Sequence, residues 1–503
     1  QGHRRRPHRH RRLGKITPPP FLLVKISFVT PPVLIGKRPA ERSAGCTHVV
    51  YPIPNIYELT VAAVVEAMEG CRVVYRDFSG CNDDREWRQW LVGDDSDIYM
   101  VWMVNLSLKN DLLATDIIHN VHPDSFVVFL GPGATYFIAD ALSHHRNIVV
   151  RGEPEATVQH LIKTLSQHDN LTKVEGISFL GADGSVVNNP PRQLIDDLDA
   201  LPFPARHLLE GKRFHNPKLK KDGYTIAVTS RNCPFKCIYC VPSSLTFARE
   251  IEHRRYNDGR KPRIVKRSLA SIDAEMKMLH EQGYKAVGFV DDNFIWDEER
   301  TRGICEIMRR YKLAWGCQAR VDAITPTVAW LLKEGGCEYI DLGVESFDDK
   351  ILAYIKKGIT SEQIYHAIDL LKQAGVPVKL NILIGCCPLE TRQTVEHTLH
   401  EAKRLKVDQV MFNIVSPFPG TEFYKLCKEN GWLATGEYEP TDVQRNSIVN
   451  FPHLSAREME QALRRNNLSY FLSWHFVSYQ ILRFKSLSEF SAALKALKIK
   501  LFG

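Results

Sequence analysis

The 503-residue sequence predicts an α/β fold in two successive blocks of alternating strands and helices, followed by a helical segment. In residues 24–185, short apolar runs alternate with helical patterns, which predicts a doubly wound parallel sheet. Residues 223–440 contain six further strand candidates, each followed by a helical pattern or a loop. Because a closed TIM barrel has eight such units, we expect an open, partial (β/α)6 barrel. Apolar and aromatic residues at helical spacing occupy much of residues 441–503.

The first block is predicted to be a Rossmann-like sheet. Its strand candidates are Lys25–Val29, Arg72–Tyr75, Asp97–Val104, Ser125–Leu130 and Ile148–Val150. Between the first two of these strands, Asn55–Met68 has the apolar spacing of a helix. Residues 186–222 are acidic and interrupted by prolines, so we interpret them as a linker between the two blocks.

Small and polar residues follow the strands of the first block. Ligands of doubly wound sheets bind outside the carboxyl ends of the strands, and glycines there let the backbone approach a ligand closely. The candidate ligand-binding residues of this edge are Pro31, Asn105, Ser107, Gly131, Gly133, Gly152 and Glu153.

The second block supplies the barrel. Its predicted strands are Thr225–Thr229, Ala286–Val290, Trp315–Ala319, Tyr339–Val344, Lys379–Ile384 and Gln409–Ile414. Its predicted helices include Ser271–Glu281, Glu299–Tyr311, Pro326–Glu334, Ser361–Ala374 and Arg392–Arg404. A further helix is expected over Ala456–Leu482.

Polar residues also follow the barrel strands, at the end where barrels of this kind place reactive groups. These candidates are Asp291, Asp292, Arg320, Glu345 and Ser346, and Asn381 lies within the fifth strand. The alternative is that they cap the helices that follow, since Asp and Ser are favoured N-caps. Capping carries more weight for Asp291 than for Glu345 and Ser346.

Cys233, Cys237 and Cys240 stand at C-x3-C-x2-C spacing just after the first barrel strand. Three thiolates on one loop can hold three irons of a [4Fe–4S] cube and leave the fourth iron open. The alternative is a structural zinc site, but zinc takes four ligands, and no fourth Cys or His lies near at finger-like spacing. The other nine of the 12 cysteines are scattered, which suits a reducing cytoplasm better than a disulfide scaffold.

The cysteine spacing, with Tyr239 before the last cysteine, resembles the radical S-adenosylmethionine (radical SAM) family. The segments D-D-N-F at 291–294, G-V-E-S at 343–346 and S-P-F-P-G-T at 416–421 are similar to recurring features of that family. In the first block, Pro31-Pro32, G-P-G-A-T at 131–135 and G-E-P-E at 152–155 resemble the cobalamin-binding domain that precedes the radical SAM domain in class B methyltransferases. The resemblance covers residues 24–440.

The resemblance implies three cofactors: a [4Fe–4S] cluster on the three cysteines, S-adenosylmethionine and cobalamin. It implies cleavage of S-adenosylmethionine to a 5′-deoxyadenosyl radical and, in the methyltransferase members, methylation of an unactivated carbon through methylcobalamin. Tyr239 is expected on the adenine side of the cluster loop, and the polar barrel residues are expected to bind S-adenosylmethionine. The expected partners are a small-molecule substrate of unknown class and a reductant such as flavodoxin or ferredoxin.

Two rival functions remain open. One is a cyclase or oxidoreductase like the anaerobic tetrapyrrole cyclases, and the other is a radical SAM enzyme whose first domain is a docking module without cobalamin. Two features depart from the family. D-x-H-x-x-G is absent, so cobalamin is expected to bind base-off and without a His ligand, and His48 is the nearest imidazole in sequence. Gly385-Cys386-Cys387-Pro388 stands where Gly, one residue, Pro is commoner.

The net charge of +8 lies almost wholly at the amino end. Residues 1–23 contain seven basic residues and no acid, which leaves about +1 for the rest of the chain. A near-neutral body gives no indication of nucleic-acid binding. We expect residues 1–23 to be sequence upstream of a true start near Val24, with a disordered basic tail or an Arg-rich transit peptide as the alternatives. The basic, amphipathic stretch Leu487–Phe502 is expected to pack on the barrel, with weak membrane-surface contact as the alternative.

Overall fold

The structure is a computed structural model that describes residues 23–35, 52–209, 211–439 and 442–481. Its first seven strands form one sheet: β1 (Val24–Thr30), β2 (Cys71–Asp77), β3 (Ile98–Trp102), β4 (Phe126–Leu130), β5 (Asn147–Val150), β6 (Ile177–Leu180) and β7 (Val186–Asn188). The strand order is β2-β1-β3-β4-β5-β6-β7, and the first five strands are parallel, as predicted. The antiparallel strands β6 and β7 were not predicted, and β7 carries the sheet past residue 185.

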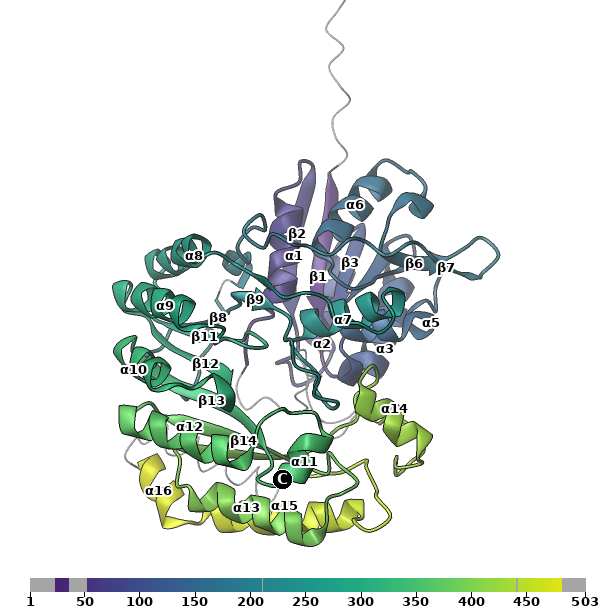
Figure 1. The fold of residues 1–503 in the computed structure, drawn as a ribbon. Coiled ribbons are helices and arrows are strands. Elements are labelled where there is room, and N and C mark those ends of the chain that lie inside the picture. Colours follow the sequence, from purple (N-terminus) through teal and green to yellow (C-terminus); the bar gives the residue numbers. More distant parts are fainter. Residues whose placement is uncertain (1–22, 36–51, 210, 440–441, 482–503) are drawn as a thin grey trace, which may run out of the picture.

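Helices cover both faces of this sheet (Figure 1). They are α1 (Ile56–Glu66), α2 (Arg85–Gly93), α3 (Leu108–Val121), α4 (Gly131–Tyr136), α5 (Ile138–Ala141) and α6 (Glu155–Ser166). Side chains of one strand alternate between the two faces, so Ile26 and Phe28 pack with Leu59 of α1, whereas Val29 packs with Trp87 of α2. The sheet is therefore doubly wound.

The second sheet is an open, partial barrel. Its strands are β8 (Tyr224–Ala227), β11 (Ala286–Phe289), β12 (Ala314–Arg320), β13 (Cys337–Glu345), β14 (Val378–Ile384) and β15 (Gln409–Ile414). They lie in the order β15-β14-β13-β12-β11-β8, and every pair is parallel. All six strands were predicted. Because neighbours in sequence are neighbours in space, each strand returns through its own crossover, and the predicted (β/α)6 architecture is confirmed.

Helices line the outer face of the barrel (Figure 1). They are α8 (Leu269–Glu281), α9 (Glu298–Arg310), α10 (Pro326–Glu334), α12 (Ser361–Ala374) and α13 (Arg392–Arg404). Two shorter helices, α11 (Asp349–Tyr354) and α14 (Glu422–Glu429), follow β13 and β15, and α14 lies toward the first sheet. Three elements between β8 and α8 were not predicted: the antiparallel ribbon of β9 (Ser230–Arg231) and β10 (Val265–Lys266), and α7 (Ser244–Tyr256). These elements flank the cysteine loop.

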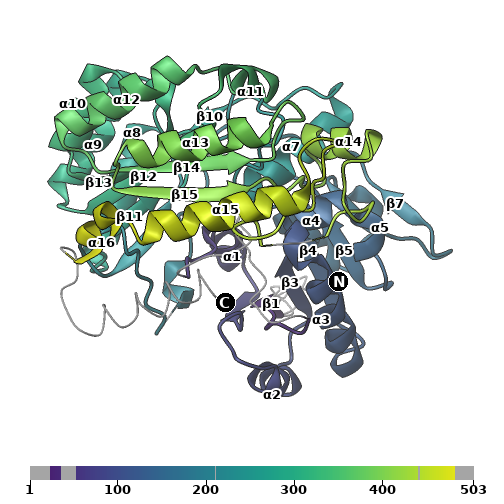
Figure 2. The same ribbon diagram turned by 90° about the horizontal axis from the view of Figure 1, so that it is seen from below.

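The carboxyl-terminal helix lies beside β15 (Figure 2). Tyr470 holds it there, because its hydroxyl accepts a hydrogen bond from the backbone N–H of Val410 (2.9 Å). The predicted single helix is instead two, α15 (Ala456–Phe471) and α16 (Trp474–Ile481). Ser473 separates them, since its hydroxyl donates to the Tyr470 carbonyl and accepts from the Phe476 N–H. The predicted tail helix Leu487–Phe502, the segment 1–22 and His48 lie outside the described residues.

The linker closes the amino end of the barrel. Leu219 and Phe214 pack with Tyr224 and Tyr339, which lie at the starts of β8 and β13, and with Ile56 of α1. Beside this apolar layer, the Lys218 ammonium lies 2.8 Å from the Asp341 carboxylate. The carboxyl end of the barrel is thus the end left for a site. No helix in the described part of the chain is both long and apolar enough to span a membrane.

Candidate active site

The three predicted cluster cysteines lie on one loop between β9 and α7. Each thiol is half-buried and none forms a disulfide. Two other elements hold the loop from opposite sides: the Ile238 N–H donates to the Ile355 carbonyl after α11 (3.1 Å), and the Ile238 carbonyl accepts from the Phe423 N–H of α14 (2.9 Å). The structure therefore presents three free thiols from one fixed loop.

Asp292, after β11, secures the backbone at both ends of this loop, and Asp291 secures the residues that lead into it. Asp292 accepts from the N–H of Asn232 (3.2 Å) and from that of Ser243 (2.6 Å), the residues just outside the cysteines. Asp291 accepts from the backbone and hydroxyl of Thr229 and from the Ser230 hydroxyl, at 2.6–3.1 Å. Asp292 thus positions the cluster loop and Asp291 the segment before it, whereas the sequence predicted helix capping or cofactor binding. Their predicted contact with S-adenosylmethionine stays a prediction.

Burial controls the protonation of these groups. It raises the pKa of Asp291 to about 6, although hydrogen bonds from Ser230 and Thr229 favour the carboxylate. Burial likewise raises the pKa of the Cys240 thiol well above its usual range, and the neighbouring Cys237 thiol adds to the effect. Within the described ranges, no three Cys, His, Asp or Glu side chains converge on one point as ligands of a single ion. A cube does not need such convergence, because each thiolate binds a different iron.

Tyr239, Lys357 and Glu345 form a polar group beside the loop. The Lys357 Nζ lies 2.8 Å from the Glu345 Oε1 and 3.5 Å from the Tyr239 hydroxyl. Burial opposes the charge of Lys357, but the Glu345 carboxylate outweighs it and raises the pKa of the ammonium. Glu345 has a φ of 69° at a register shift of β13. Such left-handed backbone in a non-glycine residue is uncommon and clusters at functional sites.

The other predicted barrel residues divide into anchored and available side chains. Arg320 lies over the ring of Phe235 in the cluster loop, at 3.4 Å from its centroid, and also pairs with Asp322 (2.9 Å). Ser346 shares a hydrogen bond with Thr398 of α13 (3.1 Å), so it fastens the strand to a helix. Asn381, half-buried on β14, makes no side-chain hydrogen bond with any described residue and remains available to a ligand.

At the first sheet, the order β2-β1-β3 makes a topological switch point between β1 and β3. Pro31 is buried at the end of β1. Asn105, in the turn after β3, donates to the Pro419 carbonyl of the barrel (3.0 Å), and its buried Oδ1 has no partner among the described residues. Ser107 is instead used locally, bonding to Val104 and Asp111.

The predicted glycines pack against protein. A Cβ on Gly131 would lie 2.7 Å from the Met103 carbonyl oxygen, and one on Gly133 would lie 2.8 Å from the Val104 carbonyl carbon. Gly152 has a φ of 70° and faces Glu252 of α7. A Cβ on Gly152 would lie 3.1 Å from the Cβ of Glu252. These glycines permit close packing of α4 on β3 and of the β5 edge on α7. Their predicted contact with a cofactor stays a prediction.

Glu153 lies in a buried ion-pair network. Its Oε1 is 2.9 Å from Arg231 Nη1 and 3.1 Å from Arg249 Nε, and the Arg231 Nη2 lies 2.5 Å from Glu155. Arg231, Glu155, Arg249 and Lys357 were not predicted as site residues. The only sequence signal for Arg231 is its place two residues before Cys233.

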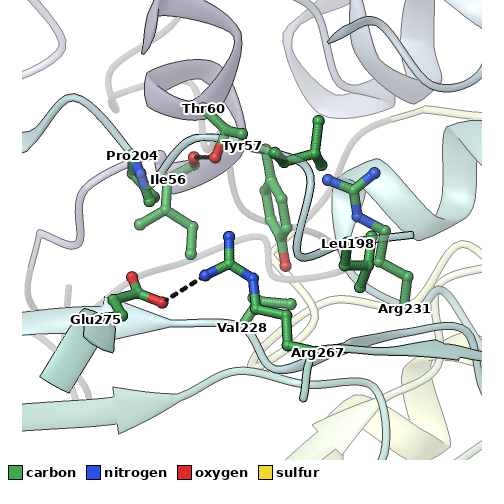
Figure 3. A pocket seen from close by; sticks show the side chains of 10 residues that line it. Ile56, Tyr57, Thr60, Leu198, Pro204, Val228, Arg231, Arg267 and Glu275 are labelled. Carbon is green, nitrogen blue, oxygen red and sulfur yellow. Dashed lines mark hydrogen bonds and ion pairs between the residues drawn. The ribbon is translucent and has the colours of Figure 1, made fainter. Parts of the chain in front are cut away.

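A small pocket lies where α1, the linker and the barrel meet (Figure 3). Tyr57 points into it, and opposite Tyr57 the Arg267 guanidinium is paired with Glu275 at 2.9 Å. The pocket encloses about 30 Å³, which is room for water but not for a nucleoside. We therefore interpret it as a seam between the packed parts.

Comparisons with known proteins agree with this geometry. The sequence pattern of the radical SAM superfamily matches residues 227–402. An uncharacterized methyltransferase of Pyrococcus horikoshii is 31% identical over 385 residues, which cover 75% of this chain and 79% of the relative. The hopanoid C-3 methylase of Methylococcus capsulatus is 27% identical over 329 residues, covering 64% of this chain and 58% of the methylase, so the chain spans little more than half of that relative.

The fold is also that of a solved structure. The cobalamin-dependent S-adenosylmethionine radical enzyme OxsB superposes with a TM-score of 0.68 at 15% identity, over 95% of this chain and 72% of OxsB. At that identity the likeness concerns the fold, namely a doubly wound sheet joined to a partial barrel. The cysteine loop, the matched family pattern and the Pyrococcus relative together show that the chain belongs to the radical SAM superfamily of enzymes.

Proposed function

We propose that this chain is a cobalamin-dependent radical SAM methyltransferase that methylates an unactivated carbon of a small molecule. The observation that carries the proposal is that the ligand edges of the two sheets meet. Asn105, after β3, reaches the Pro419 carbonyl at 3.0 Å, and Glu153, after β5, reaches Arg231 at the end of β9, directly before the cluster loop, at 2.9 Å. A group bound at the first edge would therefore lie close to a radical formed at the second.

The residues of the loop fit a [4Fe–4S] cluster. Cys233, Cys237 and Cys240 would hold it, because they are free thiols on a loop whose ends Asp292 fixes. Three thiolates leave one iron for S-adenosylmethionine. The Lys261 ammonium lies 3.5 Å from the Cys233 carbonyl oxygen and 3.1 Å from the Glu250 carboxylate, and its charge favours the Cys233 thiolate.

The first sheet fits cobalamin at the switch point between β1 and β3. The buried Asn105 Oδ1 is an acceptor without a donor among the described residues, and the side-chain amides of a corrin are donors. Pro31 and the turn at Asn105–Ser107 would form the walls. No D-x-H-x-x-G motif supplies an imidazole to the metal.

When bound, the cluster supplies the electron that cleaves S-adenosylmethionine, and methylcobalamin supplies the methyl group. The residues of the chain bind, orient and exclude water. Lys357 offers a buried ammonium to a carboxylate or hydroxyl, with Glu345 as its counter-ion. Asn381 offers an amide, and the Tyr239 ring forms the side of the loop nearest Lys357. The electron comes from a flavodoxin or ferredoxin in a reducing cytoplasm.

The test uses the full chain reconstituted anaerobically with iron, sulfide and cobalamin. Methyl-labelled S-adenosylmethionine and a reductant are then added, and labelled methylcobalamin and 5′-deoxyadenosine are quantified. The proposal expects both products. Formation of 5′-deoxyadenosine without cobalamin binding would favour the docking-module rival. Once a substrate is found, product mass separates methylation, which adds a methylene unit, from cyclisation, which removes hydrogens.

A further inference from the structure

We propose that Arg231 is a positioning residue that locks the cluster loop to the ligand edge of the first sheet through Glu153 and Glu155. Glu153 belongs to the edge that resembles a cobalamin-binding motif, yet its carboxylate faces the barrel domain. The proposal deepens the proposed function, and it rests on that function where it treats the first sheet as the cobalamin carrier.

The contacts of Arg231 form a buried bridge that consists of two ion pairs. Arg231 uses both ends of its guanidinium: Nη1 lies 2.9 Å from Glu153 and Nη2 lies 2.5 Å from Glu155. The side chains of Arg231, Glu153 and Glu155 are 7%, 4% and 1% exposed. The second oxygen of Glu153 accepts from the Ile195 N–H of the linker (2.7 Å). One carboxylate therefore joins the first sheet, the linker and the barrel.

A second path leads from Glu153 to the same loop. Arg249 of α7 lies 3.1 Å from Glu153 through Nε, and its Nη1 donates to the Oδ1 of Asn232. Asn232 precedes Cys233 and has a φ of 76°, a left-handed conformation that Asn adopts more readily than most residues. Both paths thus end at the residues that begin the cluster loop.

The chemistry of the bridge demands arginine. A planar guanidinium can bind two carboxylates at once in a fixed geometry, whereas the ammonium of lysine is a single point charge. Because the charged groups are buried, removal of one group leaves the opposite charge without a counter-ion. The bridge therefore acts as a rigid spacer between the two ligand edges rather than as a flexible surface contact.

The test compares two bridge variants with a matched control, all in the full chain loaded with the cluster. E153Q removes the shared carboxylate, and R231K keeps the positive charge but loses the planar guanidinium that binds two carboxylates at once. The control E252Q breaks another buried pair at the same interface, Arg151 with Glu252 at 2.8 Å, which joins the first sheet to α7 without contacting the cluster loop. Hydrogen exchange of residues 232–243 and the EPR spectrum of the reduced cluster are measured.

We expect exchange in residues 232–243 to rise at least roughly tenfold in E153Q and R231K, the factor implied by loss of one charge-assisted hydrogen bond. We expect their EPR signals to broaden, because the cluster then occupies several positions. E252Q should keep the wild-type exchange and line shape. The proposal is overturned if R231K matches wild type in both measurements, or if E252Q loosens the loop as much as E153Q does. Neither measurement needs cobalamin, so failure to bind cobalamin would defeat the proposed function alone.

Discussion

Asp292→Asn tests how the protein holds its cluster loop. The Asp292 carboxylate accepts from the N–H of Asn232 and the N–H of Ser243, at 3.2 and 2.6 Å, and so joins the two ends of the loop. Asn has the same shape but one acceptor oxygen, and its NH2 would face an N–H donor. The variant therefore loses one charge-assisted hydrogen bond and leaves one buried donor without a partner.

The size of the effect follows from these two losses. A hydrogen bond to a charged group contributes about 1.5–3 kcal/mol, and an unsatisfied buried donor costs about 1–3 kcal/mol. Both figures count part of the same lost hydrogen bond, so they do not add in full, and we expect D292N to destabilise the closed loop by about 2–4 kcal/mol. That is a roughly 30-fold or greater rise in the population of open loop.

The assay is iron and sulfide retained per chain after anaerobic reconstitution and gel filtration, with the absorbance of the cluster as a second readout. The matched control is D297N, the same substitution at an aspartate that accepts the Arg300 N–H (2.7 Å) as the N-cap of α9, away from the cysteine loop. Asn is also a good N-cap, so D297N should retain its iron. Full iron retention in D292N would refute the reasoning.

Two further predictions concern the barrel. Gly343→Ala places a Cβ 2.8 Å from the Lys357 Nζ and 3.0 Å from the Glu345 Oε1, so it should displace this ion pair. We expect the variant to bind S-adenosylmethionine more weakly in calorimetry. An unchanged affinity would contradict the role assigned to the ion pair. The pKa of Asp291, raised by burial from 3.8 to about 6, means that the folded chain binds this proton more tightly. The free energy of unfolding should therefore fall by up to about 3 kcal/mol as the pH rises from about 4 to about 6. Urea unfolding at each pH measures this fall against Asp291→Asn, which lacks the titrating carboxyl group. If the stabilities of the two proteins changed with pH in parallel, the prediction would be contradicted.

Much of the fold could be predicted because it depends on local pattern. Most barrel strands are short, mainly apolar runs. Pro326–Glu334 matches α10 at both ends because Thr325 caps its start, Pro326 begins it and Gly335 follows its last residue. The misses arise from tertiary contacts. Strand β7 is only three residues long, and two of the three are exposed, so it is too short to show the alternating pattern of a strand. The break in the last helix depends on where the Ser473 hydroxyl bonds.

The part of the candidate site that depends on the spacing of residues in the sequence could be predicted. The three cysteines lie on one loop, so their sequence positions alone bring them together. Asp291 and Glu153 were expected near a ligand, but their partners, Ser230 and Arg231, lie far away in sequence. A sequence places a carboxylate at the end of a strand, whereas only the fold shows which donors meet it there. Lys357 was missed for the same reason, since its partner Glu345 lies on another element.

We propose that one chain carries both a cluster and cobalamin, at separate sites. The most direct measurement is the iron and cobalamin content of anaerobically reconstituted wild type, beside a variant with Cys233, Cys237 and Cys240 all changed to Ala. We predict one four-iron cluster and one cobalamin per chain in wild type, and cobalamin without iron in the variant. A four-iron Mössbauer spectrum from the triple variant, or a wild-type chain that binds no cobalamin, would contradict the account.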